Sequence, residues 1–141
     1  MSTAARLTLP ALAAFLAFAV AFATGAGSRA ADPPKKPEPQ LAHMVFFTLK
    51  DHTSAAREAF VASCRKYLTG HEGAVFFAVG TIAEDVVEGP SVRDFDVALH
   101  VVFESKEAEA AYLKHPRHTQ FVDENKASFA KVRVFDSYVS K

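Results

Sequence analysis

One segment, residues 95–118, constrains the fold more strongly than any other. Apolar and polar side chains alternate over residues 95–104, and a period of two is typical of a strand with one buried face. Ser105 can then cap a helix that continues through Tyr112. Pro116 cannot extend this helix, but it fits the first turn of another, where its missing N–H has no helical partner anyway. The alternation predicts that five side chains share the buried face: Phe95, Val97, Leu99, Val101 and Phe103.

The other apolar segments complete the order of elements. Residues 41–49, 74–81 and 132–139 are rich in β-branched and aromatic side chains, which predicts three more strands. Residues 54–68 show helical periodicity, and residues 82–94 form an acidic, Gly- and Pro-containing loop. The apolar face of this first helix comprises Phe60, Cys64, Tyr67 and Leu68. The resulting β-α-β-β-α-β order predicts an α+β, ferredoxin-like fold with a four-stranded antiparallel sheet and helices on one side.

The sheet face opposite the helices is expected to be too apolar to lie in water. Met44, Phe46, Ala98 and Val102 would lie on it, and no remaining element of the chain could cover it. A second copy of the chain is the simplest cover for such a face. We therefore expect a homodimer in which two sheets pack face to face.

The N-terminus has the layout of a secretory signal peptide, which we place at residues 1–30. Arg6 precedes an uncharged stretch dominated by Ala, Leu and Phe over residues 7–23, and small residues flank Arg29 where a signal peptidase would read them. We expect cleavage and export to the periplasm or the medium. The mature protein would then have no membrane segment.

Residues 31–40 contain four prolines and no large apolar side chain, a composition that favours an extended spacer. The folded domain then spans residues 41–141, which is enough for a single core. Loss of Arg6 and Arg29 reduces the 16 basic residues to 14 against 16 acidic ones, a net charge of −2. A nucleic-acid partner is not expected because no basic stripe accompanies this charge.

The single cysteine cannot form an internal disulfide bond. We expect Cys64 to be a buried apolar side chain rather than a nucleophile. His52 and His71 fall in expected loops, so we expect both to be exposed to solvent. Asp136, in the last strand, is expected to form a hydrogen bond or an interface contact rather than to act as a catalytic acid, since the sequence pairs no second carboxylate with it.

Four segments resemble the stress-responsive A/B barrel (Dabb) domain family, over roughly residues 41–139. The most specific segment is Tyr112-Leu-Lys-His-Pro-Arg-His118, which follows a strand ending in Phe-Glu-Ser. The other three are His43-Met-Val-Phe-Phe-Thr-Leu-Lys50, Phe95-Asp-Val-Ala-Leu-His-Val-Val-Phe-Glu-Ser105 and Val134-Phe-Asp-Ser-Tyr138. The resemblance implies a dimeric α+β barrel.

The family includes plant stress proteins without a known reaction and a polyketide cyclase that performs an aldol cyclisation. By motif position, the catalytic tyrosine and histidine of that enzyme fall on Tyr112 and His118, and a pocket histidine falls on His43. A further pocket histidine of the cyclase falls on Val97, a departure from its pattern. The resemblance, together with the alternation of residues 95–104, implies a ligand pocket lined by His43, Val97, Leu99, Tyr112 and His118. His100 is expected on the opposite face of the sheet.

These residues permit three functions. The first is binding of a small apolar or carbonyl-bearing ligand, or a structural role in stress. The second is an enzyme of lyase or isomerase type, with His118 as general base and Tyr112 as hydrogen-bond donor to an oxyanion. The third is a metal- or haem-binding barrel, in which His43, His115 and His118 could act as ligands, although Pro116 interrupts the helix between the last two. We expect no cofactor and no bound metal.

Overall fold

A computed structural model of the chain describes residues 38–140. The expected signal peptide and most of the expected linker lie outside the described residues. Gln40, which we expected at the end of the linker, is the first residue of a strand. Within residues 38–140, no helix has the length and apolar character needed to cross a membrane.

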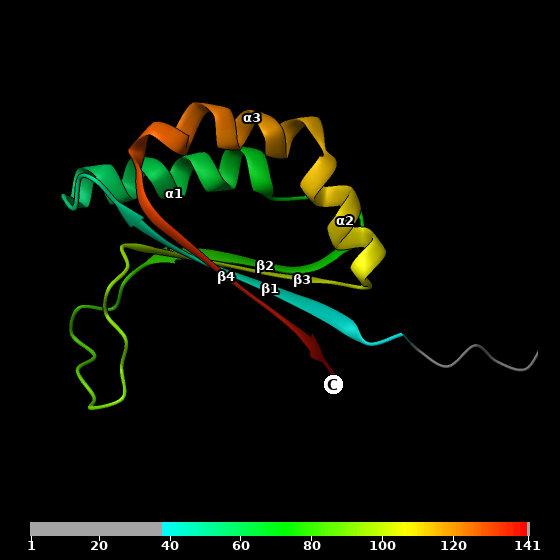
Figure 1. The fold of residues 1–141 in the computed structure, drawn as a ribbon, viewed down its shortest axis with the longest axis horizontal. Helices are drawn as coiled ribbons and strands as arrows, with labels where there is room; N and C mark the ends of the chain where they lie inside the picture. Colours follow the sequence, from blue (N-terminus) through cyan, green and yellow to red (C-terminus); the bar gives the residue numbers. More distant parts are fainter. Residues whose placement is uncertain (1–37, 141) are drawn as a thin grey trace, which may run out of the picture. The chain divides into compact units, whose positions relative to one another are not determined.

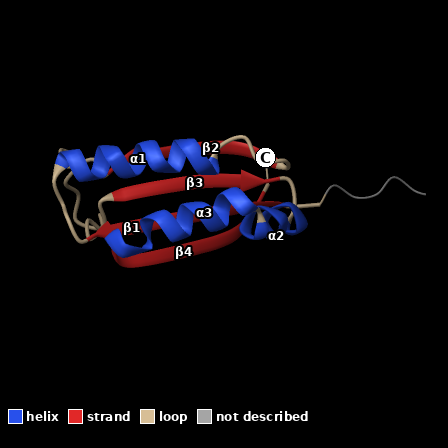
Figure 2. Cartoon of the chain, turned by 90° about the horizontal axis from the view of Figure 1, so that it is seen from above, coloured by secondary structure: helices blue, strands red, loops and turns tan. Residues whose placement is uncertain are grey.

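The structure confirms the ferredoxin-like α+β fold. Its elements are β1 (Gln40–Leu49), α1 (Ser54–Leu68), β2 (Ala74–Thr81), β3 (Val97–Phe103), α2 (Lys106–Lys114), α3 (Pro116–Asn125), the short 3₁₀ helix η1 (Lys126–Ser128) and β4 (Phe129–Val139). The four strands form one antiparallel sheet in the order β2-β3-β1-β4. Figures 1 and 2 show that the three α-helices all cover the same face of this sheet.

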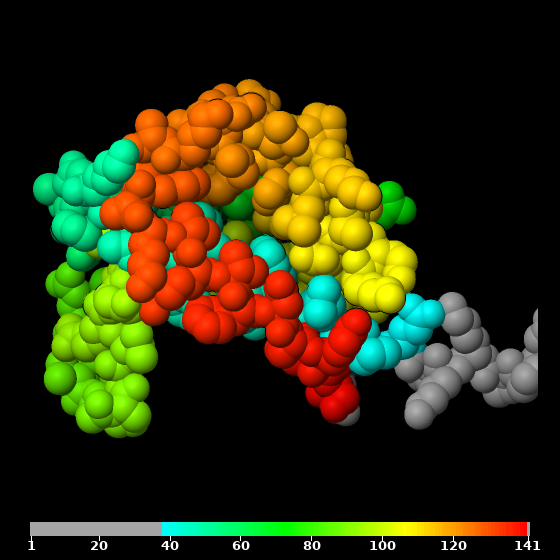
Figure 3. Space-filling model, in the orientation of Figure 1, coloured from blue at the N-terminus to red at the C-terminus, as the bar shows by residue number. Residues whose placement is uncertain are grey.

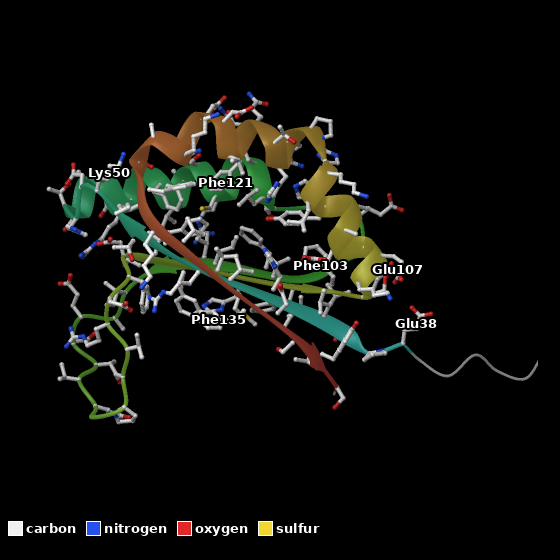
Figure 4. The ribbon with its side chains drawn as sticks, in the orientation of Figure 1. Glu38, Lys50, Phe103, Glu107, Phe121 and Phe135 are labelled. Atoms are coloured by element: carbon white, nitrogen blue, oxygen red, sulfur yellow. The ribbon has the colours of Figure 1, made fainter. Side chains whose placement is uncertain are left out.

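The core fills the space between helices and sheet. Val97, Val101 and Phe103 on β3 are fully buried, and the predicted apolar face of α1 packs against the same cluster. Aromatic side chains connect the layers, since the ring of Phe47 on β1 lies 4.8 Å from that of Phe60 on α1. In Figure 4, Phe103 and Phe121 lie between the sheet and the helices.

The start of β3 differs from the expected alternation. The strand begins at Val97 rather than at residue 95, so the alternation does not extend to Phe95. Phe95 lies with Phe46 on the other side of the sheet, at a ring separation of 5.0 Å. Asp96 is buried instead, at 2% exposure, because backbone and side-chain donors converge on it.

The face of the sheet that carries no helix is aromatic and exposed. Phe135 is 54% exposed and Phe76 is 53% exposed, and Phe46 packs edge-on against Phe135 with ring centres 5.7 Å apart. Figure 4 shows Phe135 on the side of the sheet away from the helices. This is the face that we expected a second copy to cover.

Candidate functional site

The break between α2 and α3 is built by local hydrogen bonds. Ser105 caps α2 by accepting a hydrogen bond from the Ala108 N–H at 3.2 Å. His115 ends α2 with its own N–H bonded to the Tyr112 carbonyl, and its ring Nδ1 accepts the Arg117 N–H at 3.1 Å as the cap of α3. Pro116 occupies the first turn of α3, as its fixed φ favours.

This break leaves a cavity of about 290 Å³ between the sheet and the last two helices. Its lining is mainly apolar and includes three polar residues. Figure 3 shows the surface hollowed between α3 and β4. The lining residues are His43, Val45, Phe47, Leu68, Leu99, Tyr112, Leu113, His118, Phe121, Val122, Phe129, Val132 and Val134.

Tyr112 is the most deeply buried polar residue of the cavity, at 2% exposure. Its ring packs at 5.0 Å from Phe103 and 4.8 Å from His118. Within residues 38–140, its hydroxyl has no hydrogen-bond partner. Burial raises the pKa of Tyr112, and the nearby Cys64 and Glu109 act in the same direction, so the phenol remains protonated and can donate a hydrogen bond.

His118 lies beside this phenol and is partly buried. Burial lowers its pKa, as do the charges that His43 and His71 would carry, whereas a hydrogen bond to the Leu113 backbone acts in the opposite direction. The imidazole is therefore mainly neutral near pH 7. With one nitrogen held by the backbone, the other can accept a proton or a hydrogen bond.

His43 brings two carboxylates to the edge of the cavity. Its Nδ1 lies 2.7 Å from Asp136 Oδ1 on the neighbouring strand β4 and 3.7 Å from Glu109 Oε1 on α2. Asp136 thus forms the hydrogen bond that the sequence led us to expect. In the neutral imidazole, the Nδ1–H donates to Asp136 and Nε2 retains its lone pair.

His71 also contacts this site, and the expectation that it is exposed to solvent was wrong. It is 7% exposed rather than solvated, and its ring packs edge-on against Tyr112 at 4.9 Å and against His115 at 4.7 Å. Its Nε2 donates to the Tyr67 carbonyl at 2.9 Å, and burial is the main reason why its pKa is lowered. Its position in a short loop gave no sequence signal of this burial.

The structure brings four of the five expected pocket residues to the cavity, namely His43, Leu99, Tyr112 and His118. Val97 is the exception and lies fully buried in the core, because its register opposite Phe47 and Thr81 places it toward the other end of β3. The alternative metal ligand His115 is used as a helix cap.

Two other side chains lie where the sequence analysis expected them. His100 lies on the opposite sheet face, with its Nδ1 near the sulfur of Met44. Cys64 is fully buried, and burial raises its pKa to about 12, so it is not a reactive thiol.

The sheet order and the helices on one face define a ferredoxin-like α+β domain. The model of the stress-responsive A/B barrel domain matches residues 41–139. The chain belongs to this family. A comparison with curated proteins gives no match.

Solved structures agree on the fold. A Dabb family protein with a ferredoxin-like fold from Mesorhizobium loti superposes with a TM-score of 0.61 at 23% identity, covering 74% of this chain and 100% of its own. A dimeric ferredoxin-like protein of unknown function from Thermobifida fusca gives 0.60 at 16% identity, covering 72% and 92%. A hydroxynitrile lyase from Passiflora edulis gives 0.61 at 20% identity, covering 75% and 97%. At these identities the similarity establishes the fold alone.

Proposed function

We propose that the domain binds a small, mainly apolar molecule that carries a carbonyl oxygen, in the cavity beneath the helix break. The observation that carries the proposal is the Tyr112 hydroxyl, which is buried beside the cavity without a hydrogen-bond partner in the described part of the chain. A buried unpaired donor costs free energy, and a ligand carbonyl would accept from it. The cavity lies near the lower end of the volumes that hold small molecules, ~300–1,000 Å³.

Binding of two matched probes would test this proposal. Acetophenone presents a carbonyl on an aromatic ring, and ethylbenzene has nearly the same shape without the oxygen. We expect Tyr112→Phe to weaken acetophenone binding about tenfold, the value of one hydrogen bond of ~1–1.5 kcal/mol, and to leave ethylbenzene binding unchanged. Both affinities can be measured by ligand-observed NMR. Equal loss for both probes, or no loss for either, would contradict the role of the hydroxyl.

A second function, proton transfer next to the bound carbonyl, is favoured by the His118 imidazole. Its ring centre lies 4.8 Å from that of Tyr112, and burial keeps it neutral. In an enolisation, His118 would take a proton from the carbon next to the carbonyl, while the Tyr112 hydroxyl would donate to the enolate oxygen. His43, oriented by Asp136, would be a second acceptor at the cavity edge.

Exchange of the acetophenone methyl protons in D₂O would detect this chemistry. We expect the protein to accelerate the exchange and His118→Gln to abolish the acceleration while acetophenone still binds. Exchange at the uncatalysed rate in the parent protein would limit the domain to a binding role, because the ligand would be held without proton transfer.

We further propose that the protein is an exported homodimer. The dimeric ferredoxin-like protein from Thermobifida fusca has the same fold, and the face with Phe76 and Phe135 is apolar and exposed. Val102→Glu places a charge on this face, and we expect the variant to elute as a monomer because an unpaired buried charge is strongly unfavourable.

The export step is tested by N-terminal sequencing of the protein secreted by its host, and a mature chain that begins at Met1 would refute it.

A further inference from the structure

Three side chains from three elements converge at the edge of the cavity, and no sequence motif groups them. His43 lies on β1, Glu109 on α2 and Asp136 on β4, and one ligand atom of each lies within 4.8 Å of the others. The antiparallel register pairs His43 directly with Asp136. Glu109 reaches them because it lies three residues before Tyr112, on the side of α2 that packs toward the sheet.

The chemistry of this cluster is that of a cation site. With a neutral imidazole, the three side chains carry two negative charges around one nitrogen. The Glu109 side chain is 15% exposed, and its one ion-pair partner within residues 38–140 is His43, whose Nδ1 lies 3.7 Å away. A carboxylate removed from water without a full set of donors is unfavourable, and a cation bound between the three groups would satisfy it.

We propose that His43, Glu109 and Asp136 bind a divalent transition-metal ion, with Zn²⁺ as the best match. Zn²⁺ takes imidazole nitrogen and carboxylate oxygen as ligands in tetrahedral sites, whereas Mg²⁺ and Ca²⁺ prefer oxygen ligands alone. The separations of 2.7 Å and 3.7 Å between Nδ1 and the two oxygens bracket the distance between neighbouring ligands of a tetrahedral zinc ion. The ion would take the place of the proton that Nδ1 donates to Asp136, and the neutral imidazole would then carry its proton on Nε2. The Asp136 side chain is 48% exposed, which leaves a path for the ion and a position for water.

A second observation concerns Tyr112, whose ring lies next to that of His43. The Tyr112 hydroxyl, buried and unpartnered in the described residues, lies on the same helix, and its ring is 6.2 Å from that of His43. The metal proposal can be tested apart from the ligand proposal, because two of its three ligands, Glu109 and Asp136, do not line the cavity, whereas His43 does.

Calorimetric titration of the chelator-treated protein with Zn²⁺, Mn²⁺ and Mg²⁺ would test the site. We expect one Zn²⁺ per chain, weaker Mn²⁺ binding and no saturable Mg²⁺ binding. Glu109→Gln and Asp136→Asn should each weaken Zn²⁺ binding about tenfold or more, and both nearly preserve the shape of the side chain. Binding of acetophenone by Glu109→Gln separates the two proposals, since it should persist when Zn²⁺ binding is lost.

The control variant is Glu107→Gln, which removes the same charge from α2 at a side chain that is 65% exposed and outside the cluster. Figure 4 shows Glu107 near the outer end of α2. It should bind Zn²⁺ like the parent. The proposal is overturned if the parent binds no Zn²⁺, if Glu107→Gln loses as much affinity as Glu109→Gln, or if the Glu109→Gln/Asp136→Asn double variant still binds one ion with parental affinity.

Discussion

The domain has a carboxylate with little exposure near each end of the sheet, Asp96 at one end and Glu109 on α2 at the other. The two differ in their hydrogen-bond donors. At one end, Asp96 accepts hydrogen bonds from the Leu49 N–H at 2.8 Å, from Arg57 Nε at 2.9 Å and from His52 Nδ1 at 3.0 Å. At the other end, Glu109 has only the longer contact with His43 in the described part of the chain. The Asp96 carboxylate therefore has a full set of hydrogen-bond donors, whereas the Glu109 carboxylate lacks close donors in the described residues.

The pKa values of the two groups move in opposite directions for this reason. Burial alone would raise the pKa of Asp96, but the donors from Leu49, His52 and Arg57 outweigh it and lower the value. Burial raises the pKa of Glu109, the smaller effect of His43 lowers it, and the neighbouring Asp136 carboxylate raises it further. A satisfied buried carboxylate stabilises the fold, whereas an unsatisfied one is retained at a cost and points to a binding role. Asp96 is thus structural, and Glu109 belongs to the candidate site.

The largest expected effect is the loss of stability in Asp96→Asn. The amide removes the charge that Arg57 and His52 face and turns an NH₂ group toward one of these donors. Breaking a buried, hydrogen-bonded ion pair costs about 3 kcal/mol, which corresponds to a fall in Tm of more than about 10 °C in a domain of this size. Thermal unfolding followed by circular dichroism gives the value.

The control for Asp96→Asn is Asp94→Asn, two residues earlier. The Asp94 side chain is 55% exposed and pairs with Arg133 at 2.6 Å, and exposed ion pairs contribute less than about 1 kcal/mol. If both variants lose the same stability, the hydrogen bonds of Asp96 are not what distinguishes this end of the sheet.

A smaller loss of stability is expected when the pH is lowered. It should arise from two histidines at the cavity end of the domain. Burial lowers the pKa of both His71 and His118 in the folded protein, so below the unfolded value of ~6.5 the unfolded chain binds more protons than the folded one. The contribution of these two histidines to the free energy of unfolding is therefore fully present above about pH 6.5. It decreases as the pH falls toward their pKa values in the folded protein. Asp96, whose pKa is lowered from 3.8, loses its contribution only at lower pH.

Urea midpoints at pH 7.5 and pH 5 would measure this dependence. His118→Gln should reduce the difference between the two midpoints, and His71→Gln should do the same. A difference that persists in the His71→Gln/His118→Gln double variant would assign the acid sensitivity to other groups.

The two ends also differ in how much the sequence reveals. At the cavity end, the Ser105 cap and the break at Pro116 are local features, so the placement of Tyr112 beside His118 could be anticipated. The partnership of His43 with Asp136 depends on the pairing of β1 with β4 across 93 positions of the chain. Such pairing is a property of sheet register that a strand pattern alone does not give.

Asp96 shows the other limit of sequence patterns. The alternation of residues 95–104 is correct over β3, from Val97 to Phe103, but it assigned Phe95 to the wrong face. Before β3 begins, the direction of the side chains is set by the hydrogen bonds that Asp96 accepts from the Leu49 N–H and Arg57, and not by the alternation of a strand. The sequence did contain a signal that Glu109 lies near the cavity, since it precedes Tyr112 by one helical turn and shares its face of the helix. The competing interpretation is that an acid in the first turn of a helix is exposed and stabilises the helix end.

The smallest expected effect, Glu109→Gln in the presence of a chelator, tests the comparison most directly. Without a metal, the substitution removes a largely buried charge whose one ion-pair partner within residues 38–140 is His43, at 3.7 Å, and which has the Asp136 carboxylate within 4.8 Å, so no strong hydrogen bond is lost. We expect the free energy of unfolding to stay within about 1 kcal/mol of the parent or to rise, because the desolvation cost of the charge disappears. Glu107→Gln, exposed on the same helix, should also change little. Urea unfolding of the parent and the two variants gives the free energies of unfolding. A loss of several kcal/mol in Glu109→Gln alone would mean that Glu109 stabilises the fold as Asp96 does. The distinction between the two ends of the domain would then disappear.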